Sequence, residues 1–309
     1  MTLRVLVTGA NGFAGGHLCV HLRQMGDEVI EVAGPGPSGT SDPALAIDIT
    51  DRDAVRAAIE EVKPEAVIHL AGFSSVGKSH QDPARVFTVN TVGTVQLLTA
   101  LRDRAPRARF VLVSSAEVYG PVEPGTRATE EHPLRPLSPY AASKAAAELA
   151  GLQMHRANGL AVIVARSFNH IGRGQSPAFV VPSFAAQIEA IHAGRTPPVI
   201  RVGDLSPVRD FSHVHDVVEA YRLLALKGVP GQTYNVCSGE GRTIASLLDE
   251  MLELSGVAAH IERDDTRLRP TDLPGLVGDP TRLRQLGWRP ALTVKEALRD
   301  ALDGAGPLD

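Results

Sequence analysis

Three glycines spaced by three residues follow an apolar run close to the start of the sequence. The run Val5 to Val7 is typical of a buried strand, and a helix is expected over 17–25. Between them, Gly9 permits a tight turn, Gly12 lets the backbone approach a pyrophosphate, and Gly15 lets the helix pack on the strand. The N–H groups at the helix start would favour an anion. An ordinary βα turn is the alternative, because the spacing has one residue more than G-x-G-x-x-G.

The composition and charge of the 309-residue chain favour a globular fold with a large core. The formal charge of −4 argues against a nucleic-acid partner. No apolar run is long enough to cross a bilayer and no signal peptide is visible, so no membrane partner is expected. Cys19 and Cys237 lie far apart in the sequence and are expected as buried free thiols, which fits a reducing cytoplasm.

Strand-like and helix-like segments alternate through the first half of the chain. This alternation predicts an α/β fold, a doubly wound parallel (Rossmann) sheet covered on both faces, with ligands at the carboxyl ends of its strands. After residue 167 the order changes, and a smaller C-terminal α/β cap that binds substrate is expected. The strands are expected at 28–33, 45–49, 66–71, 110–114, 160–166, 198–202 and 233–236, and the helices at 51–62, 83–104, 140–158, 177–193, 216–227 and 244–255.

These segments divide the chain into two expected domains. The dinucleotide-binding domain comprises residues 1–168 together with about 211–236. The cap comprises residues 169–210 and 237–309, and it would lie over the carboxyl edge of the sheet.

A tyrosine and a lysine four residues apart, Tyr140 and Lys144, share one face of the helix expected over 140–158. A free phenol has a pKa of about 10 and is a poor acid near neutrality. A nearby ammonium would lower the pKa of the phenol, so that Tyr140 could exchange a proton with a substrate oxygen. A surface pair is the alternative, but the strand-end serines Ser114 and Ser115 are expected to converge on the same edge.

Together these features resemble an extended short-chain dehydrogenase/reductase, of the NAD-dependent epimerase/dehydratase family, over nearly the whole chain. The resemblance implies that Ser115 polarises a carbonyl, that Tyr140 donates the proton, and that Lys144 binds the nicotinamide ribose and tunes Tyr140. The matching residues are the run 8–15 (TGANGFAG), Asp48-Ile49, His69-Leu70-Ala71-Gly72, Asn90, Gly93-Thr94, Ser115, Tyr140, Lys144, Arg209-Asp210-Phe211 and Asn235-Val236.

The resemblance also implies a bound nicotinamide dinucleotide, NADP(H) or NAD(H). The end of the second strand, where an acidic residue usually selects NAD, is Ala33-Gly34. Glu31 lies two residues earlier and no arginine follows, so NADP(H) or dual use is favoured. The expected cofactor-binding residues are Gly9, Asn11, Gly12, Phe13, Ala14, Gly15, Asp48, Ile49, Leu70, Ala71, Gly72, Asn90, Ser114, Tyr140, Lys144 and Phe168.

The substrate resemblance is to GDP-4-keto-6-deoxymannose reductases, relatives of GDP-mannose 4,6-dehydratases. It is carried by the runs 168–170 (FNH), 202–205 (VGDL), 234–239 (YNVCSG) and 269–272 (RPTD), whereas Ile171 and Arg173 depart from the reductase pattern. It implies a nucleotide-sugar substrate, with a GDP-linked sugar favoured. The expected substrate-binding residues are Ser75, Asn169, Phe179, Val180, Arg209 and Arg269; the arginines suit phosphate because their planar fork donates paired hydrogen bonds.

One residue keeps other reactions open, because sugar 4,6-dehydratases use a glutamate at the position of Glu117 as a base. Ala116 precedes it where many dehydratases carry an Asp, which favours simple ketone reduction. A dehydratase, a 4-epimerase and a non-catalytic nucleotide-binding protein remain the alternatives. No metal site is expected, because His213-x-His215-Asp216 lacks a third ligand at helical spacing. By family resemblance, the helices at 83–104 and 140–158 would form a homodimer interface.

Overall fold

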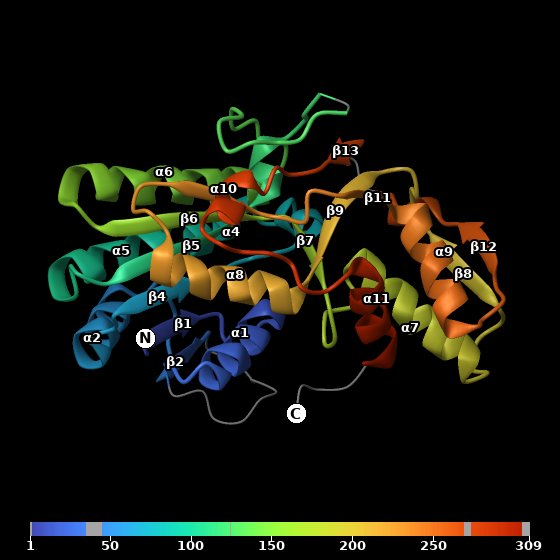
Figure 1. Cartoon of the computed structure of the whole chain (residues 1–309), viewed down its shortest axis with the longest axis horizontal. Coiled ribbons are helices and arrows are strands. Elements are labelled where there is room, and N and C mark those ends of the chain that lie inside the picture. The colour runs from blue at the N-terminus through green and yellow to red at the C-terminus, as the bar shows by residue number, and fades with distance from the viewer. Residues whose placement is uncertain (1, 35–44, 124, 269–272, 305–309) are drawn as a thin grey trace.

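A parallel sheet forms the centre of the computed structural model, which describes residues 2–34, 45–123, 125–268 and 273–304. Within these ranges the sheet has seven strands in the order β10-β6-β5-β4-β1-β2-β3, so the direction of winding reverses between β1 and β4. Figure 1 shows this sheet with the cap beside it. The strands are β1 (Arg4–Thr8), β2 (Glu28–Ala33), β3 (Leu45–Ala46), β4 (Ala66–His69), β5 (Arg109–Ser115), β6 (Ala161–Ser167) and β10 (Thr233–Val236).

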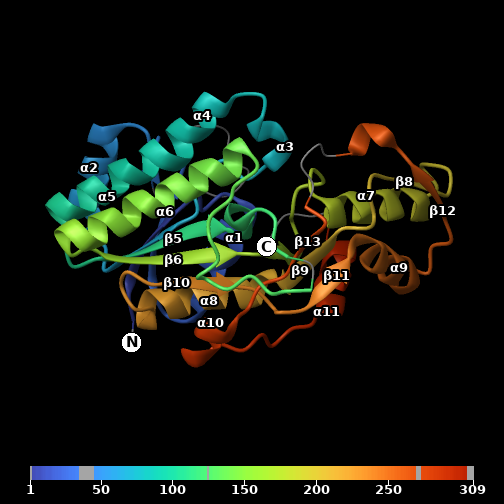
Figure 2. The same ribbon diagram turned by 90° about the horizontal axis from the view of Figure 1, so that it is seen from above.

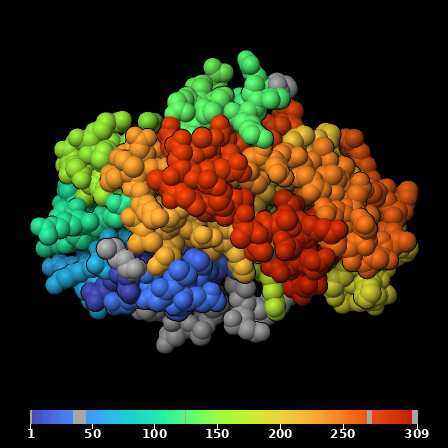
Figure 3. Space-filling model, in the orientation of Figure 1, coloured from blue at the N-terminus to red at the C-terminus, as the bar shows by residue number. Residues whose placement is uncertain are grey.

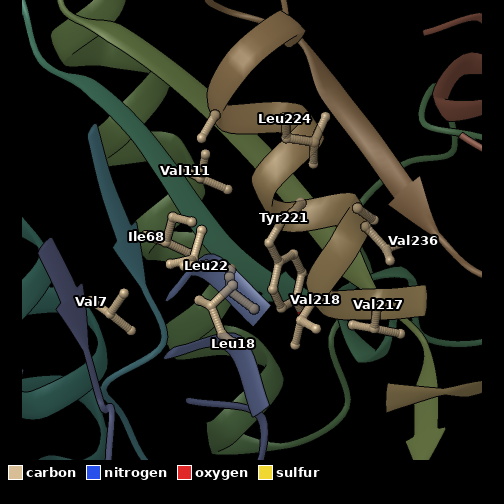
Figure 4. Close-up of a cluster of buried hydrophobic side chains, with 14 of the residues drawn as sticks. Val7, Leu18, Leu22, Ile68, Val111, Val217, Val218, Tyr221, Leu224 and Val236 are labelled. Atoms are coloured by element: carbon tan, nitrogen blue, oxygen red, sulfur yellow. The ribbon is translucent and has the colours of Figure 1, made fainter. Parts of the chain in front are cut away.

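Helices α1 (Phe13–Gln24) and α8 (Val214–Lys227) cover one face of the sheet. Their apolar side chains point at the strands, as the close-up in Figure 4 shows. Burying these side chains removes apolar surface from water, which is the main stabilising term for this layer. The buried residues labelled there are Val7, Leu18, Leu22, Ile68, Val111, Val217, Val218, Tyr221, Leu224 and Val236.

The opposite face of the sheet is covered by a second helical layer, visible above the strands in Figure 2. Its core includes Leu98 and Leu101 against Phe110 and Leu112 of β5. Helices on both faces confirm the predicted doubly wound parallel sheet. This layer comprises α2 (Arg52–Val62), α4 (Pro83–Phe87), the π-helical turn η1 (Thr88–Val92), α5 (Gly93–Arg104) and α6 (Pro139–Asn158).

The cap has its own apolar core, in which Phe184, Ile200, Leu248 and Leu298 are buried. Strand β7 enters it two residues after β6 ends, so the cap begins at the carboxyl edge of the sheet. Its main elements are β7 (Asn169–Ile171), α7 (Val180–His192), β8 (Val199–Val202), β9 (Val208–His213), β11 (Gly241–Thr243), α9 (Ile244–Ser255), β12 (His260–Arg263), β13 (Gly275–Leu276) and α11 (Val294–Asp303). The short elements are α3 (Val76–Ser79), η2 (Ala116–Tyr119), η3 (Asp265–Arg267) and α10 (Thr281–Gln285).

The C-terminal segment returns across the seam between sheet and cap, where α10 and α11 lie together on the surface in Figure 3. Trp288 donates its indole N–H to the carbonyl of Asp216 at 3.0 Å. The Asp216 carboxylate accepts hydrogen bonds from the backbone N–H groups of Ala291 and Leu292 at 2.9 and 3.1 Å. These contacts tie the start of α8 to the chain that leads into α11.

Several predicted boundaries differ from those of the structure. The helix expected over 83–104 is interrupted by the π-helical turn η1, and helix α1 begins at Phe13 because Gly12 is its N-cap. The strand expected over 45–49 stops at Ala46, because Asp48 accepts hydrogen bonds from the N–H and hydroxyl of Thr50 and turns the chain. Helix α7 begins at Val180 and not at 177, since Phe179 has extended backbone angles and is its N-cap.

The glycine turn fits closely between neighbouring segments. Gly9 has a φ of +74°, and a Cβ there would lie 2.7 Å from the backbone nitrogen of Ala71. A Cβ on Gly15 would overlap the carbonyl oxygen of Gly9. Gly9 therefore allows the turn to approach the segment after β4, and Gly15 allows α1 to pack against the turn.

We predict that Gly9→Ala destabilises the fold more than Gly26→Ala. Both glycines have positive φ, which costs an alanine about 1 kcal/mol or more. Gly26 has nothing within 4 Å of its ideal Cβ, whereas at Gly9 the new methyl group also meets backbone, adding about 1–3 kcal/mol. Denaturant unfolding of the two variants measures the difference, and equal losses of stability would contradict the close approach.

Candidate active site

Tyr140 and Ser115 meet at the carboxyl edge of the sheet. Helix α6 is started by Ser138, whose hydroxyl accepts a hydrogen bond from the N–H of Ala141 at 3.1 Å, and by Pro139 in its first turn. This start places Tyr140 next to Ser115, the last residue of β5. The predicted pairing of a strand-end serine with the helical tyrosine is therefore present.

The Tyr140 phenol is buried, and burial has the largest effect on its pKa. Burial raises the pKa of Tyr140 to about 12, Ser115 opposes the rise by hydrogen bonding, and the charge of Glu117 adds to it. The expected lowering by an ammonium was wrong, because sequence spacing does not report how far burial disfavours a phenolate. The phenol therefore stays protonated near neutral pH, which suits a proton donor.

Lys144 lies one helical turn after Tyr140 and is 7% exposed. Its Nζ donates a hydrogen bond to the carbonyl of Val113 in β5 at 2.9 Å. Burial lowers the pKa of Lys144 to about 8, and the nearby Glu148 carboxylate acts in the opposite direction. The ammonium is thus charged near neutrality and held at the same edge of the sheet.

Asn90 joins three segments around this lysine. Its Oδ1 accepts a hydrogen bond from the N–H of Phe73 at 2.8 Å, and its Nδ2 donates to the Ser143 hydroxyl at 2.9 Å. An ideal Cβ on Gly72 would lie 2.6 Å from Asn90 Oδ1 and 3.8 Å from Lys144 Nζ. The π-helical turn η1 places Asn90 where it can make these contacts.

The buried His69 side chain forms a hydrogen bond with Thr8, the last residue of β1 before the glycine turn. Thr94 donates its hydroxyl hydrogen to the carbonyl of Asn90 at 2.6 Å, so it accepts from His69 Nε2 at 3.0 Å. His69 Nδ1 is then the acceptor for the Thr8 hydroxyl at 2.6 Å. Burial lowers the pKa of His69 to about 3, which keeps the ring neutral and fixes this tautomer.

The residues at this edge fit the dinucleotide expected from the sequence. Gly9 and Gly12 bring backbone without side chains to the turn between β1 and α1, and the buried Ser114 hydroxyl has no hydrogen-bond partner in the described part of the chain. Phe13 stacks on His170 at 5.8 Å and Ile49 packs against Gly93. Glu31 pairs with Arg23 of α1, so its carboxylate is already engaged at the second strand.

A cavity of about 400 Å³ lies in the cap beside this edge. Four of the predicted substrate-binding residues line it, namely Asn169, Phe179, Val180 and Arg209. The sequence interpretation missed Arg201 and Arg267 as lining residues. Arg201 comes directly before the 202–205 run noted above, which could have indicated it. Three arginines make the cavity suited to a phosphorylated ligand.

Several residues predicted to bind the cofactor or the substrate contact other parts of the protein or lie outside the described residues. The Ser75 hydroxyl accepts from the N–H of Lys78 at 3.3 Å as the N-cap of α3, and Ser75 is not in the cavity lining among the described residues. The Asp48 carboxylate is hydrogen-bonded to Thr50. Phe168 is buried against Tyr119 at 6.3 Å. Arg269 and the 269–272 run lie outside the described residues, as do residues 35–44 after the second strand.

Asp210 was part of the matched motif but had no predicted role. Its buried carboxylate accepts hydrogen bonds from the backbone N–H groups of Ser238, Gly239 and Gly278 at 2.8, 2.9 and 3.2 Å. It thereby fixes the segments that follow β10 and β13 next to Arg209. Contacts between residues so far apart in the sequence could not be predicted from the spacing of neighbouring residues.

Three other features considered in the sequence can be examined in the described residues. His213 lies 3.2 Å from a carboxylate oxygen of Asp300, and the described residues contain no group of three or more His, Cys, Asp or Glu placed to hold a metal ion. In the same residues no helix has the length and apolar character needed to span a membrane. Cys19 and Cys237 are buried free thiols, as expected.

A family model described as GDP-mannose 4,6 dehydratase matches residues 6–301. The chain belongs to this family. It is 38% identical to a GDP-6-deoxy-D-mannose reductase from Pseudomonas aeruginosa, over 98% of this chain and 97% of the relative. It is 29% identical to a GDP-6-deoxy-D-talose 4-dehydrogenase from Aggregatibacter actinomycetemcomitans, over 91% of this chain and 90% of the relative.

Solved structures with the extended short-chain dehydrogenase/reductase fold are also similar to this chain. The structure of RMD from Pseudomonas aeruginosa complexed with NADPH has a TM-score of 0.87 and 37% identity, covering 97% of this chain and 98% of that one. UDP-glucose 4-epimerase from Thermus thermophilus, in complex with NAD, has a TM-score of 0.86 and 34% identity, covering 98% of both chains. Family members thus include reductases and epimerases on one fold.

Proposed function

We propose that the chain is an NADP(H)- or NAD(H)-dependent reductase of a nucleotide-linked 4-keto-6-deoxy sugar, with a GDP-linked sugar as the favoured substrate. The observation that carries this proposal is the buried Tyr140 phenol of α6 next to Ser115, the last residue of β5. Reduction of a ketone needs a proton donor that is neutral before the reaction. The similarity to the Pseudomonas reductase supports the choice of sugar.

The glycine turn would hold the dinucleotide. Gly9 and Gly15 let the turn pack closely, and Gly12 would let the backbone approach the pyrophosphate at the start of α1. Leu70, Ala71 and Gly72 would lie beneath the cofactor, with the Ser114 hydroxyl available to it. Bound there, the nicotinamide supplies the hydride. The remaining residues proposed to contact the cofactor are Asn11, Phe13, Ala14, Asp48, Ile49, Asn90, Tyr140, Lys144 and Phe168.

Ser115 and Tyr140 would act together on the keto oxygen. Their hydroxyl groups lie next to each other, and both would donate to that oxygen and stabilise the negative charge that develops on it. Tyr140 then gives up its proton to the oxygen, and Lys144 would stabilise the resulting phenolate by its charge. Glu117, which lies two residues after Ser115, would accept a hydrogen bond from a sugar hydroxyl.

The cavity in the cap would bind the nucleotide part of the substrate. Its volume of about 400 Å³ lies within the range of small-molecule sites. Arg209, which is 6% exposed, and Arg267 would pair with the diphosphate, while Asn169 at the end of the sheet would lie towards the sugar. Phe179, Val180 and Arg269 would complete the substrate contacts, with Ser75 on the sugar side.

We further propose that the chain is cytoplasmic and divides into the two domains expected from the sequence. Residues 1–168 with about 211–236 would bind the dinucleotide, and residues 169–210 with 237–309 would bind the nucleotide sugar. The separate apolar clusters of the sheet layers and of the cap support this division.

We also propose a homodimer formed through α4, α5 and α6. These helices lie side by side on one face of the molecule in Figure 2, and they carry exposed apolar side chains. Phe87, Val92 and Leu149 are 38%, 44% and 59% exposed. Association of two copies through this face would remove these side chains from water.

We predict that Tyr140→Phe lowers turnover of the 4-keto sugar by about 100-fold or more, because the proton donor is lost. NADPH binding, measured by fluorescence, should persist, since the ring and Lys144 remain. Tyr234→Phe is the matched control: its hydroxyl accepts from the N–H of Val229, away from the site, and its turnover should stay close to wild type. Undiminished turnover by Tyr140→Phe would exclude the assigned role.

The reductase is distinguished from a dehydratase by incubating the protein with GDP-mannose and no added reductant. A reductase should leave GDP-mannose unchanged in this experiment. Formation of a 4-keto sugar, detected by mass spectrometry, would favour the dehydratase, in which Glu117 would be the base.

For the dimer, we predict that Val92→Glu with Leu149→Glu gives a monomer, because two carboxylates would be buried in the interface. Val20→Glu is the control, since Val20 is 40% exposed on α1, on the other face of the sheet. Light scattering after size exclusion measures the mass of each variant. A wild-type monomer, or a double variant that remains a dimer, would contradict this interface.

A further inference from the structure

A third polar residue continues the line of Tyr140 and Lys144 along α6. Glu148 follows Lys144 by four residues, so the three side chains are neighbours along one face of α6. All three are buried, and α6 packs on β5 and β6 (Figure 2). Glu148 is 1% exposed, which is rare for a carboxylate and requires compensating partners. The proposed reaction uses Tyr140 and Lys144 and leaves Glu148 without a role.

Arg166 of β6 holds the Glu148 carboxylate at two points. Arg166 Nη2 lies 2.7 Å from Glu148 Oε2, and Arg166 Nε lies 3.1 Å from Oε1. Such two-point pairing fixes the orientation of the carboxylate as well as its charge. The carboxylate therefore cannot move along α6 without breaking this pair.

Arg166 is fixed in turn by groups beyond the helix. Its Nη1 donates to the carbonyl of Glu130 at 3.1 Å, and its guanidinium lies 4.8 Å from the centre of the Tyr119 ring. The Tyr119 hydroxyl donates to Asn235 Oδ1 at 2.6 Å. The ion pair is thus built into a buried network that runs from α6 to β10.

Around Lys144, Glu148 is the anionic side chain that offsets burial of the ammonium in the part of the chain described. His69 of β4 interacts with Lys144 electrostatically, but it is neutral at working pH. Tyr140 is protonated, and β5 contributes the uncharged carbonyl of Val113. The titratable or charged groups facing this region are Tyr140 and Glu148 of α6, His69 of β4, Arg166 of β6 beyond Glu148, and Glu117 beside Tyr140.

We propose that Glu148 is a positioning residue for Lys144: anchored by Arg166, its carboxylate keeps the Lys144 ammonium charged and seated at the carboxyl end of β5. This inference rests on the proposed function, in which the charged Lys144 supports the dinucleotide and Tyr140. Without the Glu148 charge, Lys144 would lose its proton at lower pH because burial disfavours the ammonium.

The test compares pH profiles of Glu148→Gln and wild type, using kcat/KM for the 4-keto sugar and the Kd of NADPH measured by fluorescence. Both activity and NADPH affinity should fall as pH rises through the Lys144 titration. In Glu148→Gln the midpoint of this fall should move to lower pH by about one unit. Asp27→Asn is the matched control, because Asp27 also forms a buried ion pair, with Arg222 at 2.6 Å, at the opposite edge of the sheet.

Glu148→Gln leaves the Arg166 guanidinium unpaired and could prevent folding, so Glu148→Gln with Arg166→Gln is a second variant that keeps hydrogen bonding without charge. Its midpoint should also move to lower pH, while Asp27→Asn should lose stability with no shift. Unshifted profiles in the folded Glu148 variants would overturn the inference. A wild-type protein that binds NADPH but reduces no 4-keto sugar would contradict the proposed function alone, and the Kd profiles would still test Glu148.

Discussion

The close approach of α6 to the carboxyl end of β5 is the contact on which the rest of the site depends. Lys144 reaches a β5 carbonyl at 2.9 Å, and Tyr140 reaches Ser115, the last residue of that strand. Helix α6 can approach β5 this closely because many residues on its buried face are small, namely alanines, a serine and Gly151. Arg166 holds the Glu148 carboxylate within the same layer, so that an anion lies in the buried stripe that also contains Lys144.

The glycine turn and the cap complete this arrangement from either side. Gly9 brings the loop after β1 against the backbone of Ala71, which follows β4. Asp210 and Asp216 fix the seam to the cap by accepting hydrogen bonds from distant backbone N–H groups. The arginine-lined cavity therefore lies beside the carboxyl edge of the sheet, where a sugar joined to a diphosphate would reach both.

Much of this could be predicted because the signals are local. The glycine spacing and the four-residue step from Tyr140 to Lys144 indicate geometry that short segments determine by themselves. Local spacing did not indicate the π-helical turn, which contains Asn90 and its contact with Phe73, seventeen residues earlier in the chain. The direction of the Tyr140 pKa shift was wrong for a related reason: burial is set by tertiary packing, which the spacing of Tyr140 and Lys144 does not encode.

Isotope transfer tests the central claim most directly. The protein would be incubated with a GDP-linked 4-keto-6-deoxy sugar and NADPH carrying deuterium at the transferable position of the nicotinamide ring, and the product examined by mass spectrometry and NMR. The account predicts one deuterium on C4 of the sugar, with the proton on the new hydroxyl coming from Tyr140. A product without deuterium at C4, or no product from protein that binds both compounds, would contradict it.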